Sequence, residues 1–200
     1  QLVALTGGVP VDRAVHPVGL RRRVVRQLVL VEDRGAVLSA YTLLDAESRG
    51  AGLRALASAR ERGLTISVDA ASAAPLRRVG AAVFLSWVRD IDLLLVNADE
   101  ATVLAGGLDP AAQGRALSAT ARRVVVKRGA AGAVWVDRTT PVCVAPANRV
   151  AVVDVTGAGD AFAAGLLTAW LAGASPSAAL GRATDLGALA VSTAGARPQA

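Results

Sequence analysis

Several residue types that catalytic and metal sites often use are scarce in this sequence. His16 is the single histidine, which excludes a histidine-rich metal site and argues against a Ser/His/Asp triad. Cys143 is the single cysteine, so no internal disulfide can form and a reducing cytoplasm is the expected compartment. Aromatic residues make up only 3% of the chain, which argues against a surface that stacks on nucleic-acid bases.

Long apolar runs are missing as well. No segment offers the roughly eighteen uninterrupted apolar residues of a membrane span, so we expect no membrane partner. The net charge is +6, carried almost entirely by arginine because Lys127 is the only lysine. Apart from Arg21, Arg22 and Arg23 the arginines are scattered, which favours a solvated surface over a nucleic-acid interface. What remains is an apolar chain of 200 residues, long enough for one domain with a real core.

Apolar runs of strand length alternate with alanine-rich patterns of helical period along most of the chain. The expected strands cover residues 34–44, 64–69, 92–97, 122–129, 132–137 and 141–146. The expected helices cover residues 47–63, 75–89, 98–106, 109–121, 159–173 and 175–195. This alternation predicts an α/β fold in which helices cover both faces of a mostly parallel sheet, with an antiparallel edge from the closely spaced last strands. Residues 1–36 show no clean period and stay an unplaced N-terminal segment, whereas residues 37–200 form the predicted domain.

Polar and glycine-rich positions follow several of the predicted strands. In parallel sheets, ligands bind where the carboxyl ends of strands lead into helix N-termini. The positions at those ends are Asp45, Asp69, residues 97–100, residues 127–132 and residues 156–160. The sequence therefore predicts a site along this edge of the sheet.

The segment "TGAGD", residues 156–160, is the most informative of these ends. It follows an apolar run that starts at Val150, which we expect to be a buried strand, and it opens an apolar helix. The amides of Ala158, Gly159 and Asp160 should be unpaired at the positive end of the helix dipole, which makes an anion site. A carboxylate at the same helix end can take a proton from an attacking hydroxyl. The alternative is that Asp160 only caps the helix.

Four motifs in order carry a family resemblance. The segment "DVTGAGDAFAAGLL" resembles the C-terminal signature of the ribokinase-like (pfkB) family of carbohydrate and nucleoside kinases. The segments "LLLVNADEATVLAG", "VVVKRGAAGAVWV" and "ALAVSTAGARP" are similar to that family's N-x-x-E segment, nucleotide-loop strand pair and C-terminal helix end. The resemblance covers residues 37–198 and implies a ribokinase-like three-layer α/β/α sandwich. It also implies phosphoryl transfer from ATP to a hydroxymethyl group of a sugar or nucleoside.

The resemblance assigns the helix start at Asp160 to the transferring phosphoryl group. Asp160 would bind and deprotonate the acceptor hydroxyl. Charge on the phosphoryl group would be stabilised by the amides of Gly157, Ala158 and Gly159. Asp154 and Thr156 match positions that hold a monovalent cation such as K⁺ in some relatives, and the alternative for Asp154 is a strand-end acid that shapes the turn.

The resemblance assigns a second group of residues to ATP. The loop under the nucleotide consists of Lys127, Arg128, Gly129, Ala130, Ala131 and Gly132. Lys127 replaces a hydroxyl residue common in relatives and would supply a point charge near the phosphates, the alternative being a strand-end charge in solvent. Asn97 and Glu100 would face the phosphates and hold Mg²⁺ largely through water, the alternative being helix capping. Thr184 matches a position beside adenine, with a helix hydroxyl facing water as the alternative.

The residues that would bind the phosphoryl acceptor are the least clearly indicated by the sequence. Asp45 is the first choice for contact with sugar hydroxyls and Asp69 the second. The early segment "TGGVP" has the family's glycine pair without the following asparagine, so the substrate and lid region looks truncated or rearranged. We therefore expect weak ATP binding without useful transfer from this chain, and an exposed apolar surface that favours self-association, with a homodimer as the candidate assembly. A non-catalytic family descendant and, less favoured, a basic nucleic-acid-binding module are the alternatives.

Overall fold

The computed structural model describes residues 28–31, 35–107 and 109–193, so His16, the three consecutive arginines and most of the unplaced N-terminal segment lie outside the described residues. The strands are β1 (Leu28–Val31), β2 (Gly35–Ser39), β3 (Thr65–Asp69), β4 (Ile91–Asn97), β5 (Ala121–Lys127), β6 (Ala133–Asp137) and β7 (Cys143–Ala145). The helices are α1 (Tyr41–Leu44), α2 (Ala46–Glu61), α3 (Ala73–Val79), α4 (Ala81–Trp87), α5 (Ala98–Ala105), α6 (Pro110–Leu117), the 3₁₀ turn η2 (Gly129–Ala131), α7 (Ala158–Leu171) and α8 (Pro176–Val191). Within these ranges, none of the helices has the length and apolar character to cross a membrane.

The described strands form one seven-stranded sheet whose spatial order follows the chain from β1 to β7. Strands β2 to β5 run parallel to one another, whereas β6 and β7 are added antiparallel. This arrangement confirms the predicted parallel sheet with an antiparallel edge. The sequence patterns did not predict β1, which pairs antiparallel with β2 at the other edge.

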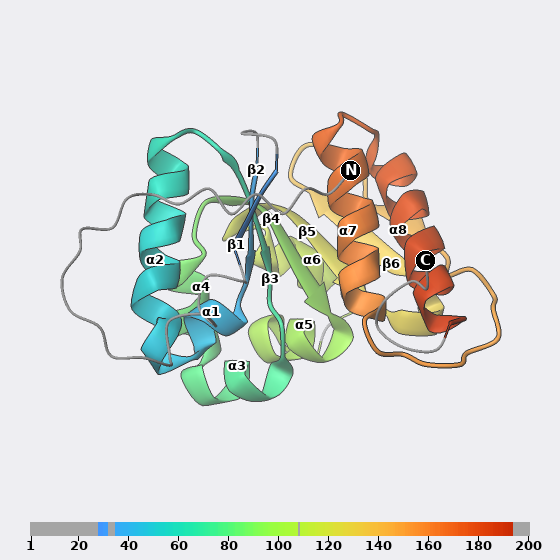
Figure 1. Cartoon of the computed structure of the whole chain (residues 1–200), viewed down its shortest axis with the longest axis horizontal. Coiled ribbons are helices and arrows are strands. Elements are labelled where there is room, and N and C mark those ends of the chain that lie inside the picture. Colours follow the sequence, from blue (N-terminus) through green and yellow to red (C-terminus); the bar gives the residue numbers. More distant parts are fainter. Residues whose placement is uncertain (1–27, 32–34, 108, 194–200) are drawn as a thin grey trace, which may run out of the picture.

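Helices cover the sheet on both faces, as predicted. Helices α7 and α8 lie together on one side of the sheet (Figure 1). Buried side chains of α1 to α6 belong to the core on one face, and those of α7 and α8 to the core on the other. In β4 the alternation of side chains sends Leu94 and Val96 into the first core and Leu93 and Leu95 into the second. A continuous apolar run therefore fits a strand that is buried on both faces. The molecule is a three-layer α/β/α sandwich.

One predicted strand and one predicted helix are divided differently in the structure. The strand predicted over residues 34–44 ends at Ser39 because its neighbour β3 ends opposite, at Asp69, and residues 41–44 form helix α1 instead. An apolar run of that length does not by itself distinguish a strand from a buried helical turn. The helix predicted over residues 75–89 is two helices, α3 and α4, which are separated by Gly80 with a φ of 90°.

The apolar run over residues 150–155 is neither buried nor a strand, contrary to the prediction. Its backbone is irregular, and Val152 and Val155 are 66% and 70% exposed. The segment is attached to the end of α8, because the Val153 amide donates a hydrogen bond of 2.7 Å to the Val191 carbonyl. β-branched residues favour extended backbone in general, so their presence could not distinguish this connection from a strand.

Candidate functional site

Three parallel strands end beside one another at one edge of the sheet. Strand β3 ends at Asp69, β4 at Asn97 and β5 at Lys127, and the register places Asn97 opposite Lys127. Helices α5 and α7 begin at this same edge, which is the lower edge in Figure 1. The structure therefore brings the predicted strand ends together with the predicted helix starts.

Lys127 forms an ion pair that the sequence did not predict. Its Nζ lies 2.6 Å from Asp69 Oδ2, and the two side chains are 14% and 25% exposed. The other carboxylate oxygen, Asp69 Oδ1, accepts a hydrogen bond of 3.0 Å from the Ala71 amide. Asp69, our second choice for sugar contact, is thus the partner of Lys127. The alternative that Lys127 is a strand-end charge in solvent is wrong, because the side chain is largely buried and paired.

The Lys127 ammonium also lies against the first turn of α7. The position that a Cβ would take on Gly159 is 4.0 Å from Lys127 Nζ. A helix N-terminus carries partial positive charge, so an ammonium at this place is unfavourable unless a negative group accompanies it. Asp69 supplies that negative group in the described structure. An anion bound here would be attracted by the ammonium and by the helix end together.

The start of α7 is a tight turn in which two amides lack an acceptor among the described residues. Gly157 has a φ of 78° and a ψ of −2°, which matches the third position of a type II turn, where glycine is favoured. The Ala158 amide closes this turn by donating to the Val155 carbonyl at 3.2 Å, so our expectation that it is unpaired is wrong. The amides of Gly159 and Asp160 have no acceptor within the described residues. The Asp160 side chain is exposed and makes no capping hydrogen bond there.

Asn97 and Glu100 form a reciprocal capping box at the start of α5. The Glu100 amide donates to Asn97 Oδ1 at 2.9 Å, and the Asn97 amide donates to Glu100 Oε2 at 2.8 Å. Asn97 Nδ2 donates to the other carboxylate oxygen, Glu100 Oε1, at 2.6 Å. Asn97 and Glu100 therefore cap helix α5, which is the alternative role that the sequence left open for them. Burial raises the pKa of the Glu100 carboxyl. The hydrogen bond from the Asn97 amide and the charge of the Lys127 ammonium act in the opposite direction but are smaller effects.

The described residues offer no ready-made metal cage. No group of three or more His, Cys, Asp or Glu side chains within them is arranged to hold a metal ion. Both oxygens of Glu100 are occupied by Asn97, and Glu100 is 1% exposed, so direct ligation by this carboxylate does not fit. The water-mediated magnesium role of Asn97 and Glu100 stays a prediction, and we derive no chemical step through a metal.

The predicted nucleotide loop projects from the end of β5. Arg128 donates from its amide to the Gly132 carbonyl at 2.7 Å, which closes the loop around η2. Gly129 and Gly132 have φ values of 56° and 83°, a region that favours glycine. A Cβ on Gly132 would collide with the Ala145 carbonyl oxygen, so the backbones approach closely there. Gly129 and the two alanines that follow it, Ala130 and Ala131, are exposed and accessible to a ligand.

The remaining predicted site residues have local structural contacts. Thr184 is only 8% exposed and its hydroxyl donates to the Gly181 carbonyl at 2.9 Å, so the alternative that it faces water is wrong. Asp154 Oδ1 accepts from the Thr156 amide at 2.8 Å, which is the turn-shaping alternative. Asp45 caps α2, accepting from the Glu47 amide and the Ser48 hydroxyl, both at 3.2 Å. None of these contacts tests the predicted ligand roles.

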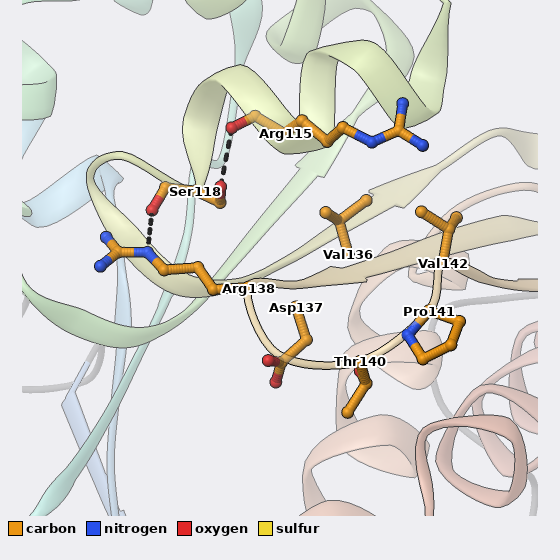
Figure 2. A pocket seen from close by; sticks show the side chains of 8 residues that line it. All are labelled: Arg115, Ser118, Val136, Asp137, Arg138, Thr140, Pro141 and Val142. Carbon is orange, nitrogen blue, oxygen red and sulfur yellow. Dashed lines mark hydrogen bonds between the residues drawn. The ribbon is translucent and has the colours of Figure 1, made fainter.

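Two surface hollows lie at the opposite edge of the sheet. Figure 2 shows one of about 450 Å³, between α6 and the loop after β6, where Arg138 Nε donates to the Ser118 carbonyl at 2.6 Å. A second hollow of about 370 Å³ is lined by Thr65, Asp92 and Arg122, near the starts of β3, β4 and β5. Neither hollow is lined by Lys127 or Asp160, so the candidate site at the ends of β3, β4 and β5 lies outside both hollows.

Comparison with known families shows the family to which the chain belongs. Residues 26–200 match the sequence profile of the pfkB family carbohydrate kinases. The chain belongs to this family. It is also 31% identical over 195 residues to an ATP-dependent ribose-1-phosphate kinase from Halopiger xanaduensis, a match that covers 98% of this chain and 59% of the relative.

Solved structures share the fold. The adenosine kinase of Sinorhizobium meliloti matches 85% of this chain with a TM-score of 0.77 at 23% identity, over 54% of its own length. The aminoimidazole riboside kinase of Salmonella enterica, solved with aminoimidazole riboside and an ATP analogue, matches 80% of this chain and 57% of its own, with a TM-score of 0.69 at 27% identity. A Vibrio cholerae fructokinase, solved with fructose, ADP and calcium, matches 80% of this chain and 55% of its own, with a TM-score of 0.69 at 26% identity. The chain thus spans little more than half the length of these relatives.

Proposed function

We propose that the edge formed by Asp69, Asn97, Lys127 and the start of α7 binds the phosphates of ATP and transfers the γ-phosphoryl group to a hydroxymethyl group of a sugar or nucleoside. One observation carries this proposal. The Lys127 ammonium lies beside the first turn of α7, whose Gly159 and Asp160 amides have no acceptor within the described residues. A multiply charged anion fits these donors, and the same turn presents an exposed carboxylate.

In the proposed reaction, the Asp160 carboxylate accepts the proton of the acceptor hydroxyl. The hydroxyl oxygen then forms a bond to the γ-phosphorus, and the bond from that phosphorus to the β–γ bridging oxygen breaks, leaving ADP. The amides of Gly159 and Asp160 and the Lys127 ammonium would stabilise the charge on the moving group. Such transfer needs little covalent chemistry from the protein, so positioning and electrostatics account for most of the rate.

The rest of the nucleotide would lie along the loop after β5. The exposed backbone of Gly129, Ala130 and Ala131 lets a ligand approach closely, and Thr184 remains our proposal for the adenine side. Magnesium would arrive with ATP and be held through phosphate oxygens and water, which suits its reluctance to shed water. Asp154 and Thr156 remain the proposed contact for a monovalent cation such as K⁺, and Asp45 the proposed contact for sugar hydroxyls.

The proposal for the class of acceptor substrate depends mainly on the relatives. Ribose 1-phosphate, adenosine, aminoimidazole riboside and fructose appear in the names and bound contents of the matched proteins. All four are sugars or nucleosides with a primary hydroxyl, which is the group that Asp160 would deprotonate. We therefore propose a pentose, a hexose or a ribonucleoside as the acceptor.

A screen of ATP consumption tests this function. The chain is incubated with Mg·ATP and each of ribose, ribose 1-phosphate, fructose, adenosine and aminoimidazole riboside, and ADP and phosphorylated product are measured together. We expect one class of acceptor to give ADP and product in equal amounts, although slowly, because the acceptor region of the sequence lacks the family's asparagine after the glycine pair of "TGGVP". ADP formed at the same rate with and without every acceptor would contradict the proposal.

A further inference from the structure

Asp69 and Lys127 meet across an intervening strand. Strand β4 lies between β3 and β5, so the Lys127 side chain extends over the end of β4 to place its Nζ 2.6 Å from Asp69 Oδ2. The two residues are 58 positions apart in the chain. A largely buried ion pair of this kind carries a desolvation cost that surface pairs avoid, so it calls for an explanation.

Asp69 itself is held in place by strained backbone. Its Oδ1 accepts from the Ala71 amide, and Ala71 has a φ of 69°, in the left-handed region that favours glycine. Strain at a non-glycine residue persists only where the surroundings enforce it, and it gathers at functional sites. The carboxylate therefore presents Oδ2 to Lys127 from a fixed turn.

We propose that Asp69 is the partner that holds the Lys127 ammonium over the first turn of α7 in the free chain and that it competes with the phosphates of ATP for this ammonium. This inference rests on the proposed function. An ammonium has three N–H donors, and the bond to Asp69 uses one of them. The others are left for an anion beside the Gly159 and Asp160 amides. Asp69 also repels that anion, because both are negative.

The effect of Asp69→Asn on nucleotide affinity distinguishes this proposal from a purely structural role of Asp69. Asp69→Asn keeps an oxygen acceptor for the Ala71 amide but removes the charge, so the turn survives while the ammonium loses its partner. Removing the negative charge should strengthen nucleotide binding by about two- to fivefold, the size of a single partly exposed charge interaction. A purely structural Asp69 would act in the opposite direction, because its loss would weaken binding.

Asp92 provides a matched control at the opposite edge of the sheet. Its side chain is 22% exposed, it lies 3.6 Å from Arg122, and it accepts a hydrogen bond of 2.9 Å from the Ile66 amide. Asp92→Asn therefore removes the same charge from a similar setting without touching the proposed phosphate edge.

The test uses the fact that Lys127 is the only lysine. A chain labelled with ¹³C,¹⁵N-lysine gives one lysine side-chain NMR signal, and calorimetry with AMP-PNP and AMP, each with Mg²⁺, gives the affinities. We expect AMP-PNP to shift that signal more than AMP does in the unaltered chain. Asp69→Asn should also shift the signal in the free chain and tighten AMP-PNP binding, and Asp92→Asn should do neither.

Three results would overturn the inference. They are weaker AMP-PNP binding by Asp69→Asn, a lysine signal that responds equally to both variants, and bound AMP-PNP that leaves the lysine signal unmoved. The last result needs only the unaltered chain, so it decides the matter even if Asp69→Asn does not fold. If AMP-PNP bound no more tightly than AMP, the proposed function itself would fail, and the phosphate role of Lys127 with it.

Discussion

Glu100 places a carboxyl group where water hardly reaches. It is 1% exposed, and burial raises its pKa above the ordinary value of 4.5, although the Asn97 amide and the Lys127 ammonium oppose the shift. Because the folded state holds this proton more tightly than the unfolded state, the resulting stabilisation is fully present below pH 4.5. It is lost as the pH rises through the raised pKa.

We predict that the difference in the free energy of unfolding between the chain and its Glu100→Gln variant depends on pH. Glutamine does not titrate, so the free energy of unfolding of the original chain minus that of the variant should fall as the pH rises from about 4 to 8. Urea unfolding of both proteins at several pH values measures this difference. A difference that stays constant would show that folding leaves the pKa of Glu100 unshifted, and a difference that grows with pH would show that folding lowers this pKa; either result contradicts the prediction.

Helices α7 and α8 pack closely because glycine lies at their contact. A Cβ on Gly165 of α7 would lie 2.7 Å from the Arg182 carbonyl oxygen of α8, nearer than real Cβ atoms approach. Gly181 of α8, by contrast, has nothing within 4 Å of its Cβ position. Since α7 carries Gly159 and Asp160 in its first turn, this packing also sets where the proposed phosphate site lies.

The two glycines predict opposite effects of the same substitution. Gly181→Ala should stabilise the protein by up to about 1 kcal/mol, because alanine favours the helix and meets no neighbour. Gly165→Ala should destabilise it by about 1–3 kcal/mol despite that preference, because the two helices must separate. Chemical denaturation of both variants measures the changes. Equal stabilisation by both would mean that the helices are not in close contact at Gly165.

For the molecule as a whole, the layers could be predicted from the sequence but several connections could not. A continuous apolar run such as residues 93–96 favours burial on both faces of a sheet, and this requires helices on either side of it. Residues 41–44 and 150–155 are apolar too, yet one forms a helical turn and the other an exposed connection. Their outcome depends on where neighbouring strands end, which no local pattern records.

For the candidate site, the position of the residues could be predicted from the sequence, but the contacts between them could not. Strand ends and helix starts on one sheet edge follow from the order of elements, so the shared position of Asn97, Lys127 and the start of α7 could be predicted. The contact between Lys127 and Asp69 joins residues 58 apart across a third strand, and neither residue type signals it alone. The capping box of Asn97 and Glu100 was only an alternative, because the same residues at the same spacing suit both capping and phosphate contact.

The central claim is that Asp160 deprotonates the acceptor hydroxyl during transfer of the γ-phosphoryl group, and one variant tests it directly. Phosphate transfer from [γ-³²P]ATP to the acceptor selected by the screen is followed for the original chain, for Asp160→Asn and for Asp99→Asn, an exposed acid in the first turn of α5. We predict that Asp160→Asn lowers kcat at least ~100-fold, the low end of a general base's contribution, and leaves AMP-PNP affinity nearly unchanged, whereas Asp99→Asn retains activity. Equal turnover by Asp160→Asn and the original chain would contradict the account.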